Sequence, residues 1–281
     1  MAGAAGRLSI FAGTGALPRY AVEAALAAGY KVQVLTLEPR GDMTKVKVIT
    51  VDVGNPLAIV WALKIFRTTH ILMVGAIHLS DKTREGLIRF ANKDAPAQAS
   101  HAPVGDATLA ALGSVLKKMT GADLVGIHEI APELLAPNGT IAGLELTADE
   151  LGFARFGLRT ARAIGRLDIG QAAVVAGQRV LAVEDIGGTD ALIARAGELR
   201  QQGLAGDGAA RLILAKAIKP QQPSFADLPA IGLQTIINCA AAGIAVIAVE
   251  AGKSLVLERA DLSIEADRLG VSVVGLEVTD E

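Results

Sequence analysis

The feature that most constrains the fold of this chain is the alternation of short apolar runs with segments of helical periodicity. Strands that alternate with helices are joined by crossover connections, which produce a parallel sheet with helices on its faces. In the first half, the expected strands are residues 8–12, 31–37, 46–51, 70–75 and 124–130, and the expected helices are 19–28, 57–66 and 106–119. We therefore expect an α/β fold that begins with a Rossmann-like parallel sheet.

A second α/β domain is expected to follow the first. Thr147 and Glu150 have the spacing of a capping box, in which two side chains satisfy backbone N–H groups at a helix start. The helix would run towards Gly165, and we place the domain boundary at its start, giving an N-terminal domain of residues 1–147 and a C-terminal domain of residues 148–281. Residues 134–143 are rich in turn formers. Further strands are expected at 172–175, 180–183, 212–216, 244–249, 254–257 and 271–276, the first two as a hairpin, with helices at 191–201, 233–241 and 262–269.

Composition excludes several classes of function. The chain carries 27 Lys and Arg against 29 Asp and Glu, a net charge of −2, and only 3% aromatic residues, so it lacks the basic excess and stacking side chains of a nucleic-acid binder. Cys239 is the single cysteine, which excludes an intrachain disulfide framework and a cysteine-rich zinc site, and we expect its thiol to be buried and inert.

Hydropathy does not indicate a membrane span. Mean hydropathy is +0.43, but the longest apolar runs, 71–77 and 239–249, are shorter than the roughly 20 residues that a bilayer-spanning helix needs. No signal-peptide pattern opens the chain. We expect a cytoplasmic protein.

A glycine-rich loop follows the first expected strand. Gly13, Thr14 and Gly15, with Leu17 and Pro18, lie where a doubly wound fold presents backbone N–H groups to a phosphate at a helix N-terminus. Pro18 stands where a dinucleotide fingerprint has its third glycine, so the standard NAD fingerprint is absent. The loop predicts contact with a phosphate or nucleotide; the alternative is an ordinary tight turn.

Acidic and hydroxyl side chains follow the strand expected to end at residue 183. Glu184 and Asp190 would face a magnesium ion or a polar substrate, since hard cations prefer oxygen ligands, and Gly188 and Thr189 lie between them. The alternative is that Thr189 or Asp190 caps the following helix.

Two lysines end a later strand. Lys216 and Lys219 precede a loop that contains Gln222 and Asp227, with Thr235 in the next helix. Strand ends in α/β folds point into the ligand crevice, where lysines neutralise phosphate charge and a carboxylate activates water or holds a metal. The alternative is solvated lysines and a capping aspartate.

His128 and Glu129 end another expected strand, which is a plausible position for ligand contact. The alternative for His128 is a hydrogen-bonded structural histidine.

Taken together, these segments resemble the UDP-2,3-diacylglucosamine pyrophosphatase family of the LpxI type, which acts in lipid A biosynthesis. The block from Ile164 to Gln171 is the most specific part. The similar stretches occur in the family's order and are distributed along nearly the whole chain: 12–18, 105–106, 128–130, 164–171, 181–184, 188–191, 216–222, 227–235 and 250–253.

The resemblance implies two α/β domains with the substrate between them, the N-terminal one a nucleotide and lipid-substrate domain and the C-terminal one catalytic. It implies hydrolysis of the UDP-2,3-diacylglucosamine diphosphate with Mg²⁺, giving UMP and 2,3-diacylglucosamine 1-phosphate (lipid X). Asp227 is then the catalytic aspartate, with Lys216 and Lys219 neutralising phosphate and Glu184 and Asp190 as metal ligands. Substrate-binding residues would be Gly13, Thr14, Gly15, Leu17, Pro18, His128, Glu129, Gln171, Gly188, Thr189, Gln222 and Thr235.

Five positions depart from the family's pattern. Leu79 and Phe225 stand where the family has arginine, Ala107 and Phe153 where it has aspartate, and Gly187 where it has glutamate. Each change removes a polar group that could contact phosphate, metal or sugar. The alternative function is therefore a catalytically impaired relative that binds a nucleotide-sugar or other phosphorylated ligand in a regulatory role; an enzyme with another phosphorylated substrate also stays open.

Partner expectations follow from the same resemblance. The ligand is a small nucleotide-sugar lipid and no nucleic acid is involved. Peripheral contact with the inner membrane and homo-oligomerisation stay open.

Overall fold

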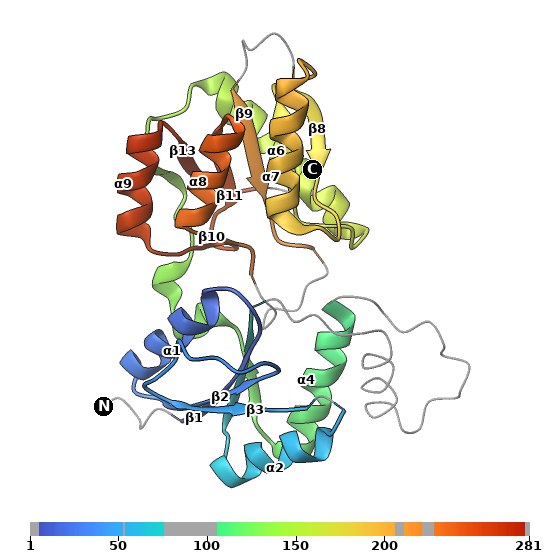
Figure 1. Ribbon diagram of the computed structural model, residues 1–281, viewed down its shortest axis with the longest axis vertical. Helices are drawn as coiled ribbons and strands as arrows, with labels where there is room; N and C mark the ends of the chain where they lie inside the picture. The colour runs from blue at the N-terminus through green and yellow to red at the C-terminus, as the bar shows by residue number, and fades with distance from the viewer. Residues whose placement is uncertain (1–5, 53, 76–105, 206–210, 221–227, 279–281) are drawn as a thin grey trace, which may run out of the picture. The chain divides into compact units, whose positions relative to one another are not determined.

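The computed structural model describes residues 6–52, 54–75, 106–205, 211–220 and 228–278, without the side chains of residues 106–112. Its contacts divide the chain into two compact units, the first ending at Glu133 and the second beginning at Leu134. Both units are α/β, which confirms the expected fold class (Figure 1). The expected boundary between residues 147 and 148 coincides with the start of a helix in the second unit and stays a prediction.

The first unit holds a five-stranded sheet in which every pairing is parallel. The strand order is β3-β2-β1-β4-β5. The strands are β1 (Arg7–Ala12), β2 (Lys31–Thr36), β3 (Lys47–Thr50), β4 (His70–Val74) and β5 (Asp123–Val125). This is the Rossmann-like parallel sheet that the alternation of apolar runs predicts.

Helices cover both faces of this sheet. The chain moves one way along the sheet from β1 to β2 through α1 (Leu17–Ala27), and the other way from β3 to β4 through α2 (Pro56–Phe66). Since crossovers are right-handed, the two helices lie on opposite faces. Helix α4 (Asp106–Thr120) shares a buried core with α2, built around Leu63 and Leu116.

The second unit holds a six-stranded mixed sheet in the order β6-β13-β11-β9-β7-β8. β9, β11 and β13 are parallel, whereas β6, β7 and β8 add antiparallel pairings, including the expected β7–β8 hairpin. The strands are β6 (Gly139–Ala142), β7 (Ala172–Ala176), β8 (Arg179–Val183), β9 (Leu212–Lys216), β11 (Ile244–Glu250) and β13 (Ser272–Leu276). A separate two-stranded sheet pairs β10 (Ala230–Ile231) with β12 (Leu255–Val256).

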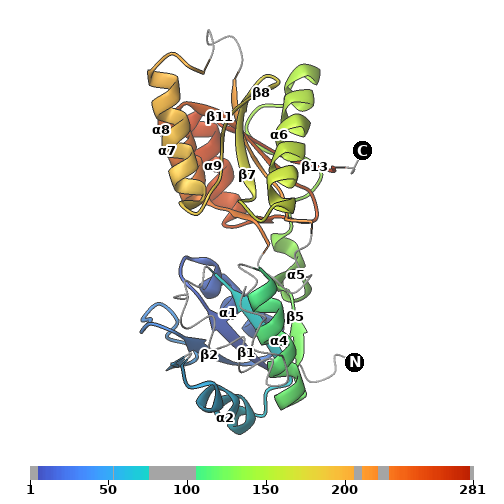
Figure 2. The same ribbon diagram turned by 90° about the vertical axis from the view of Figure 1, so that its right-hand side faces the viewer.

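Helix α6 (Ala148–Arg166) packs on one face of the six-stranded sheet, and the other three helices pack on the opposite face (Figure 2). These are α7 (Gly188–Gln201), α8 (Leu233–Ala242) and α9 (Arg259–Leu269). The start of α6 confirms the expected capping box, because Glu150 Oε2 accepts a bond from the Thr147 N–H at 2.8 Å and Thr147 Oγ1 accepts one from the Glu150 N–H at 3.3 Å.

One local expectation is wrong. The strand expected over 124–130 ends at Val125, and α5 (Ile127–Ile130) follows it, because Glu129 Oε1 accepts a bond from the Gly126 N–H at 2.7 Å and starts a helical turn. His128 and Glu129 therefore lie on a helix rather than at a strand end. The turn-rich segment 134–143 contains strand β6 and begins at the last residue of the 3₁₀ turn Pro132–Leu134. The sequence pattern predicts neither of these elements, nor β10, which has only two residues.

Within the described residues, no helix combines the length and apolar character needed to cross a membrane.

Candidate functional site

Three neighbouring strand ends of the second unit bring predicted site residues to one edge of the sheet. β8 and β9 end at the edge where β7 begins, since β7 is antiparallel to both. Lys216 pairs with Ala172, and the Glu184 N–H donates to the Ala172 carbonyl at 2.8 Å. Glu184 and Lys216 therefore lie on one face of the sheet, about 10 Å apart across two strand spacings. This is the face that α7 and α8 cover.

Glu184 is the buried centre of a hydrogen-bonded cluster. Its side chain is only 6% exposed, and its two carboxylate oxygens accept bonds from the Thr189 hydroxyl at 2.6 Å and the Gln171 N–H at 2.7 Å. A Cβ at Gly170 would collide with the Glu184 carbonyl oxygen, so only glycine permits this approach. The structure thus brings Glu184, Thr189 and Gln171 together.

Asp190 is held by a residue that sequence reasoning missed. Its Oδ1 accepts a bond from Asn238 Nδ2 at 3.0 Å, and Asn238 Oδ1 accepts one from Gln234 Nε2 at 2.8 Å. Helix α7 begins at Gly188, after Gly187 as N-cap, and no side chain caps it. The alternative in which Thr189 or Asp190 caps the helix is therefore wrong, since both already lie in its first turn and bond elsewhere.

A magnesium site needs several free oxygen ligands that converge on one point. Both oxygens of Glu184 already accept hydrogen bonds, and Asp190 is exposed and bonded to α8. Among the residues that the structure describes, no group of three His, Cys, Asp or Glu could hold a metal ion. These residues do not by themselves fit a bound Mg²⁺, and the metal role of Glu184 and Asp190 stays a prediction.

The two predicted lysines have separate partners. Lys216 is 8% exposed, and its Nζ donates to the Ala230 carbonyl of β10 at 3.1 Å. Lys219 Nζ forms an ion pair with Asp168 at 2.6 Å, just beyond the end of α6. The two lysines therefore lie near the end of β9 on different faces of the sheet. Lys216 is on the face covered by α7 and α8, and Lys219 is beside α6.

Thr235 lies in the first turn of α8, where its hydroxyl accepts a weak bond from the Gly232 N–H at 3.4 Å. Cys239, one turn further on, is fully buried, and burial raises the pKa of its thiol to about 12. This agrees with the expected inert thiol. Asp227 and Gln222 lie outside the described residues.

Exposed aliphatic side chains lie close in sequence to the residues of this cluster. Leu167 and Ile169 come just before Gly170 and Gln171, while Val183 and Ile186 come on either side of Glu184. Their exposures are 72%, 47%, 38% and 103%. Four apolar side chains close in sequence to the cluster are therefore exposed, although Val183 points to the opposite face of the sheet from Glu184, because it comes directly before Glu184 at the end of β8.

The glycine-rich loop of the first unit lies between β1 and α1. The Gly13 N–H donates to the Val74 carbonyl at 2.8 Å, and α1 begins at Leu17, with Pro18 in its first turn. Gly75 closes against the loop: a Cβ there would lie 2.5 Å from the Thr14 carbonyl oxygen. The five predicted loop residues are therefore brought together.

Arg40 and Asp42, which sequence reasoning missed, hold this loop. Arg40 donates to the carbonyls of Gly13 and Gly15, and its guanidinium forms an ion pair with Asp42. The Asp42 carboxylate raises the pKa of Arg40, and the Arg40 guanidinium lowers the pKa of Asp42. The only signal in the sequence is an arginine soon after the end of β2.

His128 and Glu129 lie on α5 of the first unit, a short helix that contacts α1. Glu129 bonds the start of its own helix. His128 Nδ1 is buried without a hydrogen-bond partner among the described residues.

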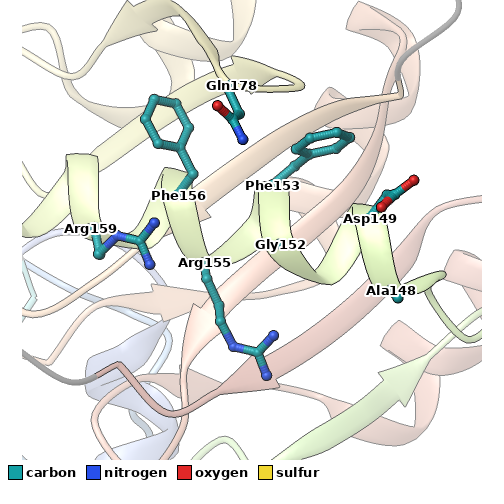
Figure 3. Close-up of a pocket in the computed structure, with 8 residues that line it drawn as sticks. All are labelled: Ala148, Asp149, Gly152, Phe153, Arg155, Phe156, Arg159 and Gln178. Atoms are coloured by element: carbon teal, nitrogen blue, oxygen red, sulfur yellow. The ribbon is translucent and has the colours of Figure 1, made fainter. Parts of the chain in front are cut away.

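A groove of about 390 Å³ lies on the outer side of α6, next to the β7–β8 turn. Figure 3 shows the rings of Phe153 and Phe156 on either side of Gln178, with Arg155 and Arg159 extending from the same helix. Phe153, one of the five departures from the family pattern, lines this groove, which contains none of the predicted site residues. Gly187 is the N-cap of α7, whereas Leu79, Phe225 and the side chain of Ala107 lie outside the described part of the chain.

Family models match nearly the whole chain. The LpxI N-terminal domain model matches residues 7–134, and the LpxI C-terminal domain model matches residues 137–274. A curated relative, the UDP-2,3-diacylglucosamine pyrophosphatase LpxI of Caulobacter vibrioides (strain ATCC 19089 / CIP 103742 / CB 15), is 42% identical over 158 residues. The matched segment spans 56% of this chain and 56% of that protein.

Similarity to solved structures is weak. The UDP-glucose 4-epimerase of Thermus thermophilus in complex with NAD is 20% identical, with 50% of this chain and 41% of that chain covered and a TM-score of 0.29. A short-chain dehydrogenase from Leptospira borgpetersenii with bound NAD⁺ is 13% identical, with 73% and 87% covered and a TM-score of 0.28.

Proposed function

Because the chain belongs to the LpxI family, we propose that it hydrolyses the diphosphate of UDP-2,3-diacylglucosamine to UMP and 2,3-diacylglucosamine 1-phosphate, a step of lipid A biosynthesis. The observation that carries this proposal is the 42% identity over 158 residues to the pyrophosphatase of Caulobacter vibrioides. That match spans 56% of the length of the relative.

The geometry of the second unit supports a reaction at phosphorus. In the hydrolysis, the oxygen of a water molecule forms a bond to one phosphorus and gives up a proton, while the bond from that phosphorus to the bridging oxygen breaks. The bridging oxygen leaves as part of the other phosphate. Negative charge grows on the phosphate oxygens, and cations placed beforehand stabilise it. Lys216 and Lys219 are our proposed cations, at the end of β9.

Asp227 is our proposed catalytic carboxylate, which would hold or deprotonate the attacking water. It comes from the resemblance to the family. Mg²⁺ dependence is part of the proposal, and a bound ion would add positive charge next to the diphosphate. No step is assigned to it, because the described residues supply no complete set of ligands.

The acyl chains of the substrate need apolar surface beside the polar cluster. We propose that Leu167, Ile169 and Ile186 supply it, since they are close in sequence to the residues of the cluster around Glu184 and are exposed. The nucleotide phosphate is proposed to lie at the glycine-rich loop of the first unit.

The decisive experiment measures UMP released from UDP-2,3-diacylglucosamine by the full chain, with Mg²⁺ and with EDTA. We expect Mg²⁺-dependent release that falls by about a hundredfold or more in Asp227→Asn, as when an essential carboxylate is removed. Asp267→Asn, an exposed aspartate on α9, is the matched control and should keep wild-type activity. Ile186→Ser should weaken binding of the diacyl substrate, whereas Ile264→Ser, which changes another exposed isoleucine on α9, should not.

Each contrary outcome has a defined meaning. Binding of the substrate without UMP release would favour the impaired regulatory relative, an outcome that the losses of polar groups at Phe153 and Gly187 make worth testing. Neither binding nor release would assign the site to another phosphorylated ligand.

A further inference from the structure

The Arg40 guanidinium is used almost completely by contacts inside the first unit. Arg40 Nε donates to Asp42 Oδ1 at 3.0 Å and Nη2 donates to Asp42 Oδ2 at 2.7 Å. Nη2 also donates to the Gly15 carbonyl at 2.9 Å, and Nη1 donates to the Gly13 carbonyl. These bonds engage most of the five N–H groups of an arginine, and its side chain is only 16% exposed. Arg40 is therefore arranged to hold the loop rather than to contact a ligand.

These contacts give the loop a direction. In a trans peptide the C=O group and the N–H group that follows it point opposite ways. Since the carbonyls of Gly13 and Gly15 both point at Arg40, the N–H groups of Thr14 and Ala16 point away from it. The side of the loop away from the guanidinium thus holds the Ala16 N–H at the start of α1, where the helix dipole also favours an anion.

Glycine makes this direction easy to lose. Gly15 has φ +88°, and nothing lies within 4 Å of where its Cβ would be. Because glycine has no Cβ, Gly13 and Gly15 restrict rotation about ψ, which sets the direction of their own carbonyls, less than other residues do. A turned peptide would aim a carbonyl oxygen at an incoming phosphate and repel it. Arg40 opposes the turn by binding both oxygens, and Asp42 fixes the guanidinium in a bidentate pair.

We propose that Arg40, locked by Asp42, is a positioning residue that keeps the Gly13–Gly15 peptides oriented to receive the nucleotide phosphate of the substrate. The inference rests on the proposed function for the identity of the ligand. It adds a residue pair that contacts no substrate but sets the affinity of the loop for phosphate.

The test measures binding of UMP to the ¹⁵N-labelled full chain, from the amide shifts of residues 13–16, in the wild type and in Arg40→Met. We expect UMP to shift these signals in the wild type and to bind about tenfold or more weakly in Arg40→Met, as expected when hydrogen bonds to a charged group are lost. Arg40→Lys keeps the positive charge but not the planar guanidinium with its several N–H donors. This variant should therefore bind UMP more tightly than Arg40→Met but more weakly than the wild type. Lys31→Met removes an exposed cation at the opposite end of β2 and should bind UMP like the wild type.

Turnover gives a second readout that a purely structural role would not move. We expect Arg40→Met to raise KM for the nucleotide-sugar lipid by a similar factor with little change in kcat, the signature of lost ground-state binding. Unchanged UMP affinity in Arg40→Met, or wild-type UMP binding that leaves residues 13–16 unshifted, would overturn the inference. Arg40-dependent UMP binding without hydrolysis would reject the proposed function and leave the inference standing.

Discussion

At the scale of single residues, two glycines shape the loop of the first unit in different ways. Gly15 and Gly75 both have positive φ, +88° and +85°. The Gly15 position is open, whereas a Cβ at Gly75 would lie 2.5 Å from the Thr14 carbonyl oxygen and 3.1 Å from the Gly13 carbonyl carbon. Gly15 is therefore needed for its backbone conformation, and Gly75 for conformation and space together.

This difference predicts unequal costs of adding a methyl group. We expect Gly15→Ala to lower the free energy of unfolding by about 1 kcal/mol, the usual cost of placing a residue with a Cβ in the left-handed conformation. Gly75→Ala should lower the free energy of unfolding by about 2 kcal/mol or more, since the backbone at Gly13 and Thr14 must also move to make room for the methyl group. Hydrogen exchange of amides in β1 and β4 under native conditions measures both. Equal losses would show that the contact with Thr14 is relieved without cost.

At the scale of elements, local chemistry at a helix start decides what a segment becomes. The apolar run 124–130 has the composition of a strand, yet the bond between Glu129 and Gly126 converts its second half into α5. At α6 the reciprocal bonds of Thr147 and Glu150 are the expected ones. The Thr147 backbone N–H lowers the pKa of the Glu150 carboxyl, with further bonds from the Thr147 hydroxyl and Arg211.

Because its pKa is lowered, the Glu150 carboxyl stabilises the folded state by an amount that depends on pH. The carboxylate stabilises the folded state above its unfolded pKa of about 4.3, and this stabilisation is lost as pH falls towards the lower folded value. We expect Glu150→Gln to lower the free energy of unfolding by about 1 kcal/mol at pH 7, as for other helix caps, and by much less at pH 3. Urea unfolding at a series of pH values checks this. Glu145→Gln, an exposed neighbour, serves as control, and a loss for Glu150→Gln that does not vary with pH would contradict the expectation.

At the scale of the whole molecule, each unit is closed by contacts between residues far apart in the chain. In the second unit, Arg162 of α6 forms an ion pair with Glu250 at the end of β11, at 3.2 Å, with side-chain exposures of 7% and 1%. Lys253 Nζ lies 2.9 Å from the same Glu250 oxygen. A buried carboxylate depends on such partners, because removing it from water costs several kcal/mol.

Breaking this pair is expected to destabilise the second unit strongly. Arg162→Met should lower the free energy of unfolding by about 3 kcal/mol. It leaves the buried Glu250 carboxylate with Lys253 as its remaining cation partner among the described ion pairs. Arg162→Met combined with Glu250→Gln should recover part of that loss, since the unpaired charge is gone. Arg155→Met, which removes an exposed arginine from the same helix, is the control. Thermal unfolding of the full chain compares the four proteins; a double variant as unstable as Arg162→Met would argue against a charge effect.

The sequence by itself determined the order of most helices and strands, the parallel sheet of the first unit, the start of α6 and the buried Cys239, because apolar periodicity and helix capping act over a few residues. It also indicated the loop from Gly13 to Pro18 and the residues around Glu184. Only the tertiary structure decided that Arg40 binds the carbonyls of that loop, that Asn238 holds Asp190, and that Lys219 pairs with Asp168 rather than standing beside Lys216. These partners come from separate elements, and a hydrogen bond between them exists only once the sheet order and the packing of helices bring the atoms within reach.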